Sequence, residues 1–303
     1  MTDQAEKLRQ VIDNLKLKQS VNRVIVPAVP VKRNARVITV TSGKGGVGKT
    51  NVTINLAIAL SEQGQRVIIL DADFGLANID VLFGIVPQYT LLDVIRDRKN
   101  IQEVLTEGPR NTKFISGGSG VEDLVKLDRQ QIARFVENMA MLDKMADIII
   151  VDTGAGLSEN VMSFVTAADE VLLVTTPEPT SITDAYSLIK MVTNRDRTKM
   201  IRVIVNRSES SEEANDVLNK LLLVADKFLG IRLEAAGYIL HDESVVKAVK
   251  QQQPFSLLYP KSQAARNIRE ISDGLIKKVS MMQMQQNSGV RGFLSRLVGL
   301  MKA

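Results

Sequence analysis

The chain has 303 residues, of which 45% are hydrophobic and 24% charged, a composition typical of a globular protein with a full core. It contains no cysteine and one histidine, which excludes disulfides, iron–sulfur clusters, thiolate metal sites and sites built from several histidines. The formal net charge of +5 lies in the tails, because residues 1–35 carry +4 and residues 277–303 carry +5, which leaves −4 for the body.

The distribution of apolar and charged residues also bears on the location and the partners of the protein. No apolar run approaches 18 residues, and residues 1–35 have no apolar segment of a signal peptide, so we expect a cytoplasmic protein. A body that binds DNA is usually basic, so no nucleic-acid partner is expected.

The N-terminal segment, residues 1–35, divides into a helix and a linker. Residues 3–18 place Leu8, Val11, Ile12 and Leu15 at helical spacing among charged residues, which predicts an amphipathic helix. Residues 19–35 contain two prolines and read as a linker.

Residues 36–282 are expected to form one α/β domain. Short apolar runs rich in β-branched residues alternate there with longer amphipathic segments, which predicts a mostly parallel sheet covered by helices on both faces. The expected strands are 37–40, 67–70, 148–151, 171–174, 201–205 and 235–240. The expected helices are 49–62, 129–144, 157–167, 181–193, 211–229, 243–250 and 261–282.

Residues 43–50 form a phosphate-binding pattern between the first expected strand and helix. They read GKGGVGKT and fit G-x-x-x-x-G-K-[ST]. Glycines let backbone N–H groups curl around phosphate oxygens, while Lys49 is expected to contact the β- and γ-phosphates and Thr50 to bind Mg²⁺. The expected nucleotide-binding residues are Gly43, Lys44, Gly45, Gly46, Val47, Gly48, Lys49 and Thr50.

An ordinary phosphate loop does not need the second lysine, Lys44. With it, KGGVGKT resembles the deviant Walker A motif of the MinD/ParA ATPases. That resemblance implies a P-loop NTPase fold, ATP or ADP and Mg²⁺ as ligands, and a homodimer formed around two nucleotides. It also implies that Lys44 reaches the nucleotide held by the partner subunit, as an arginine finger does.

Carboxylates follow two of the expected strands. Asp71 and Asp73 end the second strand, where parallel sheets bind ligands. The segment from Asp71 resembles the family's switch I, which implies that Asp73 orients the attacking water. Asp71 is a candidate metal ligand, or alternatively a cap of the following turn. Asp152 follows four apolar β-formers, a Walker B pattern whose carboxylate holds Mg²⁺ with Thr50, and Gly154 stands where the family often has proline.

Three further residues enter through the resemblance. Asn206, which closes the strand 201–205, matches the residue that reads the adenine edge, although it also fits a simple turn residue. Glu178 lies in the segment that resembles the family's contact with ribose and partner subunit. Asp184 matches the position that pairs with the early lysine in the resting monomer.

The C-terminal segment, residues 283–303, reads as a linker and a short basic amphipathic helix. Such a helix is typical of an interfacial membrane anchor, which the MinD branch also carries, and the alternative is a helix docked on the body. The apolar residues fall on one helical face, and those expected in an anionic membrane surface are Phe293, Leu294, Leu297, Val298 and Met301.

The first residues carry a second resemblance. The segment DQAEKLR resembles the start of the FlhG (FleN, YlxH) family of flagellar number and placement regulators. That family's segment contacts and stimulates FlhF, an SRP-type GTPase, and flagellar C-ring components are further partners. The residues that match are Asp3, Gln4, Ala5, Leu8 and Arg9.

Together these features predict a slow, Mg²⁺-dependent, dimer-activated ATPase that is cytoplasmic and joins the inner face of the cell membrane when ATP-bound. The alternatives are a division-site regulator of the MinD type, a partition ATPase of the ParA type that binds DNA, and a nucleotide-binding scaffold without significant turnover. An iron–sulfur carrier of the same superfamily is excluded because the chain has no cysteine.

Overall fold

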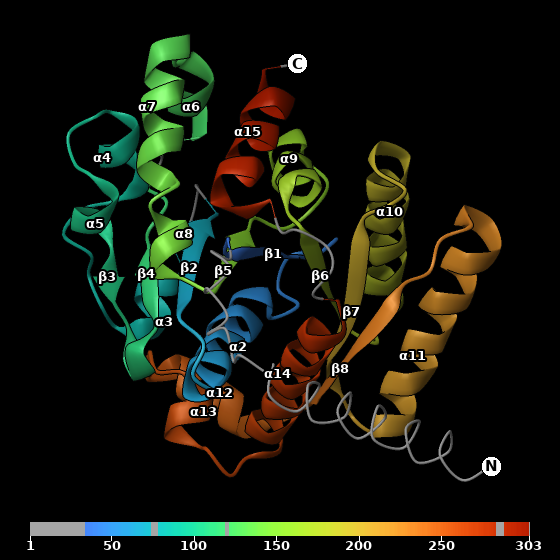
Figure 1. Ribbon diagram of the computed structural model, residues 1–303. Coiled ribbons are helices and arrows are strands. Elements are labelled where there is room, and N and C mark those ends of the chain that lie inside the picture. The colour runs from blue at the N-terminus through green and yellow to red at the C-terminus, as the bar shows by residue number, and fades with distance from the viewer. Residues whose placement is uncertain (1–33, 74–77, 119–120, 283–287, 303) are drawn as a thin grey trace, which may run out of the picture. The chain divides into compact units, whose positions relative to one another are not determined.

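The computed structural model describes residues 34–73, 78–118, 121–282 and 288–302 (Figure 1). The predicted helix at 3–18 and linker at 19–33 lie outside the described residues, and so do the five residues expected to activate FlhF. Described residues from Asn34 onwards form one compact unit, which includes the C-terminal helix.

Within the described residues, eight strands form one sheet in the order β3-β4-β2-β5-β1-β6-β7-β8. Neighbouring strands are parallel except for β3 and β4, which pair antiparallel at one edge. The strands are β1 (Arg36–Thr41), β2 (Val67–Ala72), β3 (Thr106–Glu107), β4 (Lys113–Ile115), β5 (Ile148–Thr153), β6 (Glu170–Thr175), β7 (Met200–Ser208) and β8 (Glu234–Leu240). The predicted α/β class is confirmed, and the six predicted strands all appear.

Helices cover both faces of the sheet (Figure 1). On one side lie α2 (Lys49–Glu62), α3 (Ile79–Phe83), α12 (Glu243–Lys250), α13 (Phe255–Leu258) and α14 (Gln263–Met282). On the other lie α4 (Leu91–Ile95), α5 (Ile101–Val104), α6 (Val121–Lys126), α7 (Arg129–Met139), α8 (Leu142–Met145), α9 (Glu159–Ala167), α10 (Pro179–Arg195), α11 (Ser211–Val224) and α15 (Gly289–Met301). The 3₁₀ helix η1 (Pro109–Asn111) precedes β4, and the π-helix η2 (Ala225–Leu229) follows α11.

The central strands are apolar on both faces because each face is covered. Every residue of β1, β2, β5 and β6 is buried. Alternate residues of β5 enter different cores: Ile150 packs with α2 and α14, whereas Ile149 and Val151 pack on the opposite side. The register sets Asp152 of β5 beside Asp71 of β2 and Val40 of β1. The sheet itself therefore brings the strand-end carboxylates together.

A buried ion network lies at the amino ends of β1, β6, β7 and β8. Glu170 accepts hydrogen bonds from both Arg36 and Arg202, and Arg202 also pairs with Glu234 at 3.0 Å. Arg202 is 1% exposed. A buried charge of this kind needs a partner, and this network links four strands at the edge of the sheet opposite the carboxyl edge.

The C-terminal helix α15 docks on the body, which is the alternative that the sequence left open. Its apolar residues Val290, Phe293, Leu294 and Leu297 are buried in the core that includes α7 and α9. The Phe293 ring lies 6.3 Å from the ring of Phe164 in α9. Val298 and Met301 are half-buried. No described helix is long and apolar enough to cross a bilayer.

Candidate nucleotide-binding site

The phosphate loop connects β1 to α2 at the carboxyl edge of the sheet. Gly46 and Gly48 have φ values of 79° and 89°, in the region that favours glycine. At Gly43 a Cβ atom would lie 2.4 Å from the backbone carbonyl of Asp184, so that position has no room for a side chain. Lys49 then begins α2, whose N-terminus faces the loop.

Asp152 is the point where the phosphate loop and β5 meet. Its Oδ1 atom accepts hydrogen bonds from Lys49 Nζ at 2.8 Å and from Thr53 Oγ1 at 2.9 Å. Its Oδ2 atom accepts one from Thr50 Oγ1 at 2.8 Å. Asp152 is fully buried, so these three donors compensate for the cost of removing the carboxylate from water. The predicted Walker A and Walker B residues are therefore brought together.

Asp71 holds the loop that follows β2. Its carboxylate accepts hydrogen bonds from the backbone N–H groups of Asp73, Asn78 and Ile79. Burial, and then the charge of Asp152, raise the pKa of Asp71 to about 7, although the three N–H groups act in the opposite direction. The alternative that Asp71 caps the following turn is confirmed, and its role as a metal ligand stays a prediction.

Asp73 lies beside the segment that follows Asp152. A Cβ atom on Gly154 would lie 3.6 Å from Asp73 Oδ1, which is ordinary van der Waals contact. The N–H of Gly156 donates to Ser42 O at 2.9 Å and so connects this segment to the start of the phosphate loop. Residues 74–77, which complete the switch I resemblance, lie outside the described residues.

Lys44 is not paired with Asp184, the partner that the resemblance implied. Its Nζ atom donates to Glu178 Oε2 at 2.8 Å and to Thr180 Oγ1 at 2.9 Å. The hydrogen bond from Lys44, followed by the charge of Lys44, lowers the pKa of the exposed Glu178 carboxyl. The backbone carbonyl and Cβ of Asp184 lie against Gly43, whereas Glu178, the N-cap of α10, is the carboxylate in contact with Lys44.

Asn206 belongs to β7 and touches the phosphate loop directly. Its Nδ2 atom donates to Val47 O at 2.7 Å, and a Cβ on Gly48 would lie 2.5 Å from the same nitrogen. It is therefore not a simple turn residue, and its contact with adenine stays a prediction. Arg207 follows in a left-handed conformation, with φ 59°.

The residues at this site fit a nucleoside triphosphate with Mg²⁺. A hydroxyl and a carboxylate, Thr50 and Asp152, lie together at a helix N-terminus beside Lys49, and Mg²⁺ prefers few protein oxygens plus phosphate and water. Among the described residues, no cluster of three or more histidine, aspartate or glutamate side chains could hold a metal ion.

Sequence reasoning missed two contacts at this site. Thr53 lies four residues after Lys49 on α2, which puts both side chains on one helix face toward Asp152. That spacing was the available signal. For Thr180, which shares Lys44 with Glu178, the sequence carried no comparable signal.

Comparison with known proteins agrees with this geometry. The family profile described as "ParA: NUBPL iron-transfer P-loop NTPase" matches residues 33–276. Antiactivator FleN of Pseudomonas aeruginosa is 42% identical over 265 residues, which cover 87% of this chain and 93% of FleN. The chain belongs to the MinD/ParA family of P-loop ATPases, in its FleN/YlxH flagellar branch.

Two further relatives support this placement. The flagellum site-determining protein YlxH of Helicobacter pylori is 32% identical and covers 88% of this chain and 91% of YlxH. The MinD structure from Pyrococcus horikoshii, complexed with Mg-ADP, has a TM-score of 0.65 and 27% identity, covering 82% of this chain and 98% of that chain. The iron transfer named in the family description has no thiolate ligands here, because the chain lacks cysteine.

Proposed function

We propose that the protein is a Mg²⁺-dependent ATPase of the FleN/YlxH branch whose ATP-bound dimer regulates flagellar number and placement. The observation that carries the catalytic part is the convergence of Lys49, Thr50 and Thr53 on the fully buried Asp152. A nucleotide-binding scaffold would use the same residues to hold Mg²⁺ and nucleotide, so phosphate release above background is the measurement that separates it from an ATPase.

The residues of the chain divide the work of hydrolysis. Lys49 and the loop N–H groups bind and orient the phosphates, and Thr50 with Asp152 would hold Mg²⁺. The metal would neutralise phosphate charge when bound. Thr53 fixes the orientation of Asp152, and Asp73 orients the water that attacks the γ-phosphate. Asn206 moves from Val47 to the adenine edge.

Lys44 completes the site in trans. Its side chain is 40% exposed and contacts Glu178 and Thr180. An ion pair this exposed is worth little in free energy, so it can exchange for a phosphate of the partner subunit's nucleotide. Glu178 then becomes free to meet ribose, as the family resemblance implies. This arrangement explains why turnover would need a dimer.

We expect Asp73→Ala to keep the ATP-bound dimer and to lower turnover by about a hundredfold, because general acid–base positioning contributes on that scale. The measurement pairs size-exclusion chromatography in Mg-ATP with a phosphate-release assay. Asp80→Ala, which removes a carboxylate from α3 outside the Asp152 cluster, is the matched control. Normal turnover in Asp73→Ala would remove the switch I assignment.

The docked helix α15 is the proposed membrane anchor. A face made of Phe293, Leu294 and Leu297 can either pack on the body, as it does here, or enter the interface of an anionic bilayer. ATP-driven dimerisation would release two such helices at once, and the pair gains from effective concentration where one helix binds weakly. Membrane attachment at the cytoplasmic face is thus a consequence of the nucleotide state.

The N-terminal segment is the proposed activator of FlhF, with Gln4 as the central residue and Asp3, Ala5, Leu8 and Arg9 in support. C-ring components are further proposed partners. We expect a peptide of residues 1–35 to stimulate GTP hydrolysis by FlhF, and a Gln4→Ala peptide to lose most of that effect. Equal stimulation by a Gln10→Ala peptide is the control. Absence of stimulation by the wild-type peptide would contradict this part of the proposal.

A further inference from the structure

Helix α9 connects the nucleotide site to the C-terminal helix. It begins directly after the segment 152–156, with Ser158 accepting a hydrogen bond from Val161 N as its N-cap. It spans nine residues, roughly 14 Å, and packs along α15, where Phe164 meets Phe293. A displacement after Asp152 therefore reaches α15 through one rigid element.

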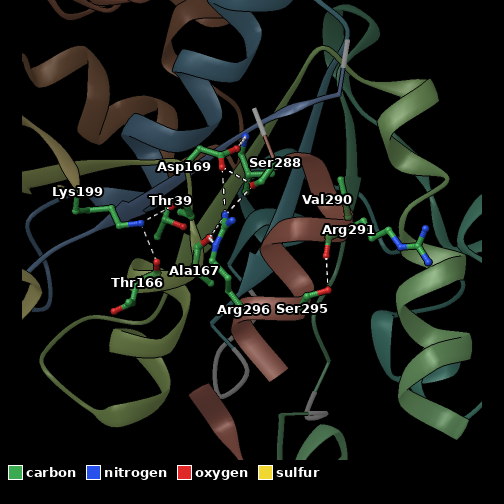
Figure 2. A network of polar contacts seen from close by, with 12 residues as sticks. Thr39, Thr166, Ala167, Asp169, Lys199, Ser288, Val290, Arg291, Ser295 and Arg296 are labelled. Atoms are coloured by element: carbon green, nitrogen blue, oxygen red, sulfur yellow. Dashed lines mark hydrogen bonds and ion pairs between the residues drawn. The ribbon is translucent and has the colours of Figure 1, made fainter. Parts of the chain in front are cut away.

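Side chains from outside α9 cap its C-terminal end (Figure 2). Lys199 Nζ donates to the carbonyls of Thr166 and Ala168, at 2.8 and 2.7 Å. Arg296 of α15 donates from Nε and Nη2 to the carbonyl of Ala167, at 2.8 and 2.5 Å. The last carbonyls of a helix lack partners within it and attract cations, so the part of this cap that Arg296 supplies stabilises α9 only while α15 is docked.

The same guanidinium is held by a second set of contacts at the start of β6 and of α15. Arg296 Nη2 lies 3.2 Å from Asp169 Oδ1 and 2.8 Å from Ser288 Oγ, and Ser288 Oγ donates to Asp169 Oδ1 at 2.7 Å. Figure 2 shows these side chains converging between the two helices. We call Arg296, Asp169, Ser288 and the Ala167 carbonyl the clasp.

The clasp uses geometry that only arginine supplies. Two donors of one planar fork reach a single carbonyl, while the outer nitrogen also serves a carboxylate and a hydroxyl. By contrast, the side chain of Arg291 on the same helix is exposed and makes no polar contact with another described residue. The two arginines therefore differ in the docked form, although both are positively charged residues of the proposed membrane helix.

We propose that Arg296 is the residue through which the nucleotide site controls α15: it caps α9 in the docked form and transfers to an anionic lipid headgroup when α9 shifts. This inference rests on the membrane function proposed above. The Nε and Nη2 atoms that serve the Ala167 carbonyl are then not available for the two parallel hydrogen bonds of a guanidinium with a headgroup phosphate. Movement of α9 and binding of anionic lipid therefore favour the same released form of α15.

The test uses the full-length chain with Arg296→Lys and the matched variant Arg291→Lys. Both keep the positive charge for lipid, but only the first removes the clasp's fork. Binding is measured on phosphatidylcholine vesicles containing phosphatidylglycerol, with ADP and with a non-hydrolysable ATP analogue. We expect Arg296→Lys to raise binding in ADP by about tenfold, with faster hydrogen exchange in α15, and Arg291→Lys to match the wild type.

Coupling is reciprocal, so the same vesicles must raise the wild-type affinity for the ATP analogue, and this effect must shrink toward onefold in Arg296→Lys. Ser288→Ala gives a second, milder variant that leaves both arginines in place. Identical behaviour of Arg296→Lys and Arg291→Lys, with nucleotide-dependent wild-type binding, would overturn the inference and leave the membrane proposal standing. Wild-type binding that ignores the nucleotide would overturn the membrane proposal itself.

Discussion

Replacing Lys49 by alanine is expected to lower the affinity for ATP by about a hundredfold or more. Charge-assisted hydrogen bonds contribute about 1.5–3 kcal/mol each, and the proposal assigns this ammonium to the β- and γ-phosphates. The measurement is titration with a fluorescent ATP analogue. Lys190→Ala, which truncates an exposed lysine on α10, is the control and should bind like the wild type. An unchanged affinity in Lys49→Ala would contradict the site.

The same substitution has a second, separable effect on stability. Asp152 is fully buried, and loss of its ammonium partner leaves a carboxylate held by two threonine hydroxyls. Breaking a buried pair from one side costs about 3–5 kcal/mol, so the thermal midpoint should fall by roughly 5–15 °C. The double variant Lys49→Ala with Asp152→Asn removes the unpaired charge. We expect it to recover stability without recovering nucleotide affinity.

Deleting residues 289–303 is expected to abolish co-sedimentation with anionic vesicles while leaving Mg-ATP hydrolysis in place. The deletion also removes the buried Phe293, Leu294 and Leu297 from the core shared with α7 and α9. That newly exposed apolar face should bind a hydrophobic dye and promote aggregation. Vesicle binding that survives the deletion would contradict the anchor role.

A point substitution tests the docking of α15 on the body without deleting the helix. Leu297 is 1% exposed, whereas Leu300 on the same helix is 36% exposed. Leu297→Ala should weaken docking by about 2–5 kcal/mol, and Leu300→Ala by much less, because only the first opens a cavity. If both variants release the helix equally, the docked packing described here is wrong.

The parts of the site that a local sequence pattern marks could be predicted from sequence. The glycine pattern marks the loop at 43–50, and the run of β-branched residues 148–151 marks Asp152, which follows it directly. Parallel strands end at one edge, so the convergence of Lys49, Thr50 and Asp152 followed from the sheet alone.

Contacts that depend on where one side chain ends were beyond the sequence. Glu178 is the N-cap of α10 and Asp184 lies six residues later, and the sequence spacing does not say which of the two carboxylates contacts Lys44. Likewise, the apolar face of α15 was evident from periodicity, but periodicity does not say whether a bilayer or a protein core covers it. The strands β3 and β4, with two and three residues, are too short to give a pattern.

The buried network of Arg36, Arg202 and Glu170 illustrates a further limit. Arg202 interrupts the apolar run 201–205 and would be assigned to the surface by its type. Its partners come from β6 and β8, so its burial could be understood only after the strand order was known.

The central claim is that each site is completed by Lys44 of a second copy, and turnover per chain against protein concentration tests it most directly. With saturating Mg-ATP, we expect turnover to rise with concentration and then level off, and Lys44→Ala to remain low throughout. Lys44 pairs with Glu178 of its own chain through exposed side chains, and the proposal is that each Lys44 exchanges this contact for the nucleotide of the partner subunit. Turnover that is independent of concentration, and equal in Lys44→Ala, would contradict the account.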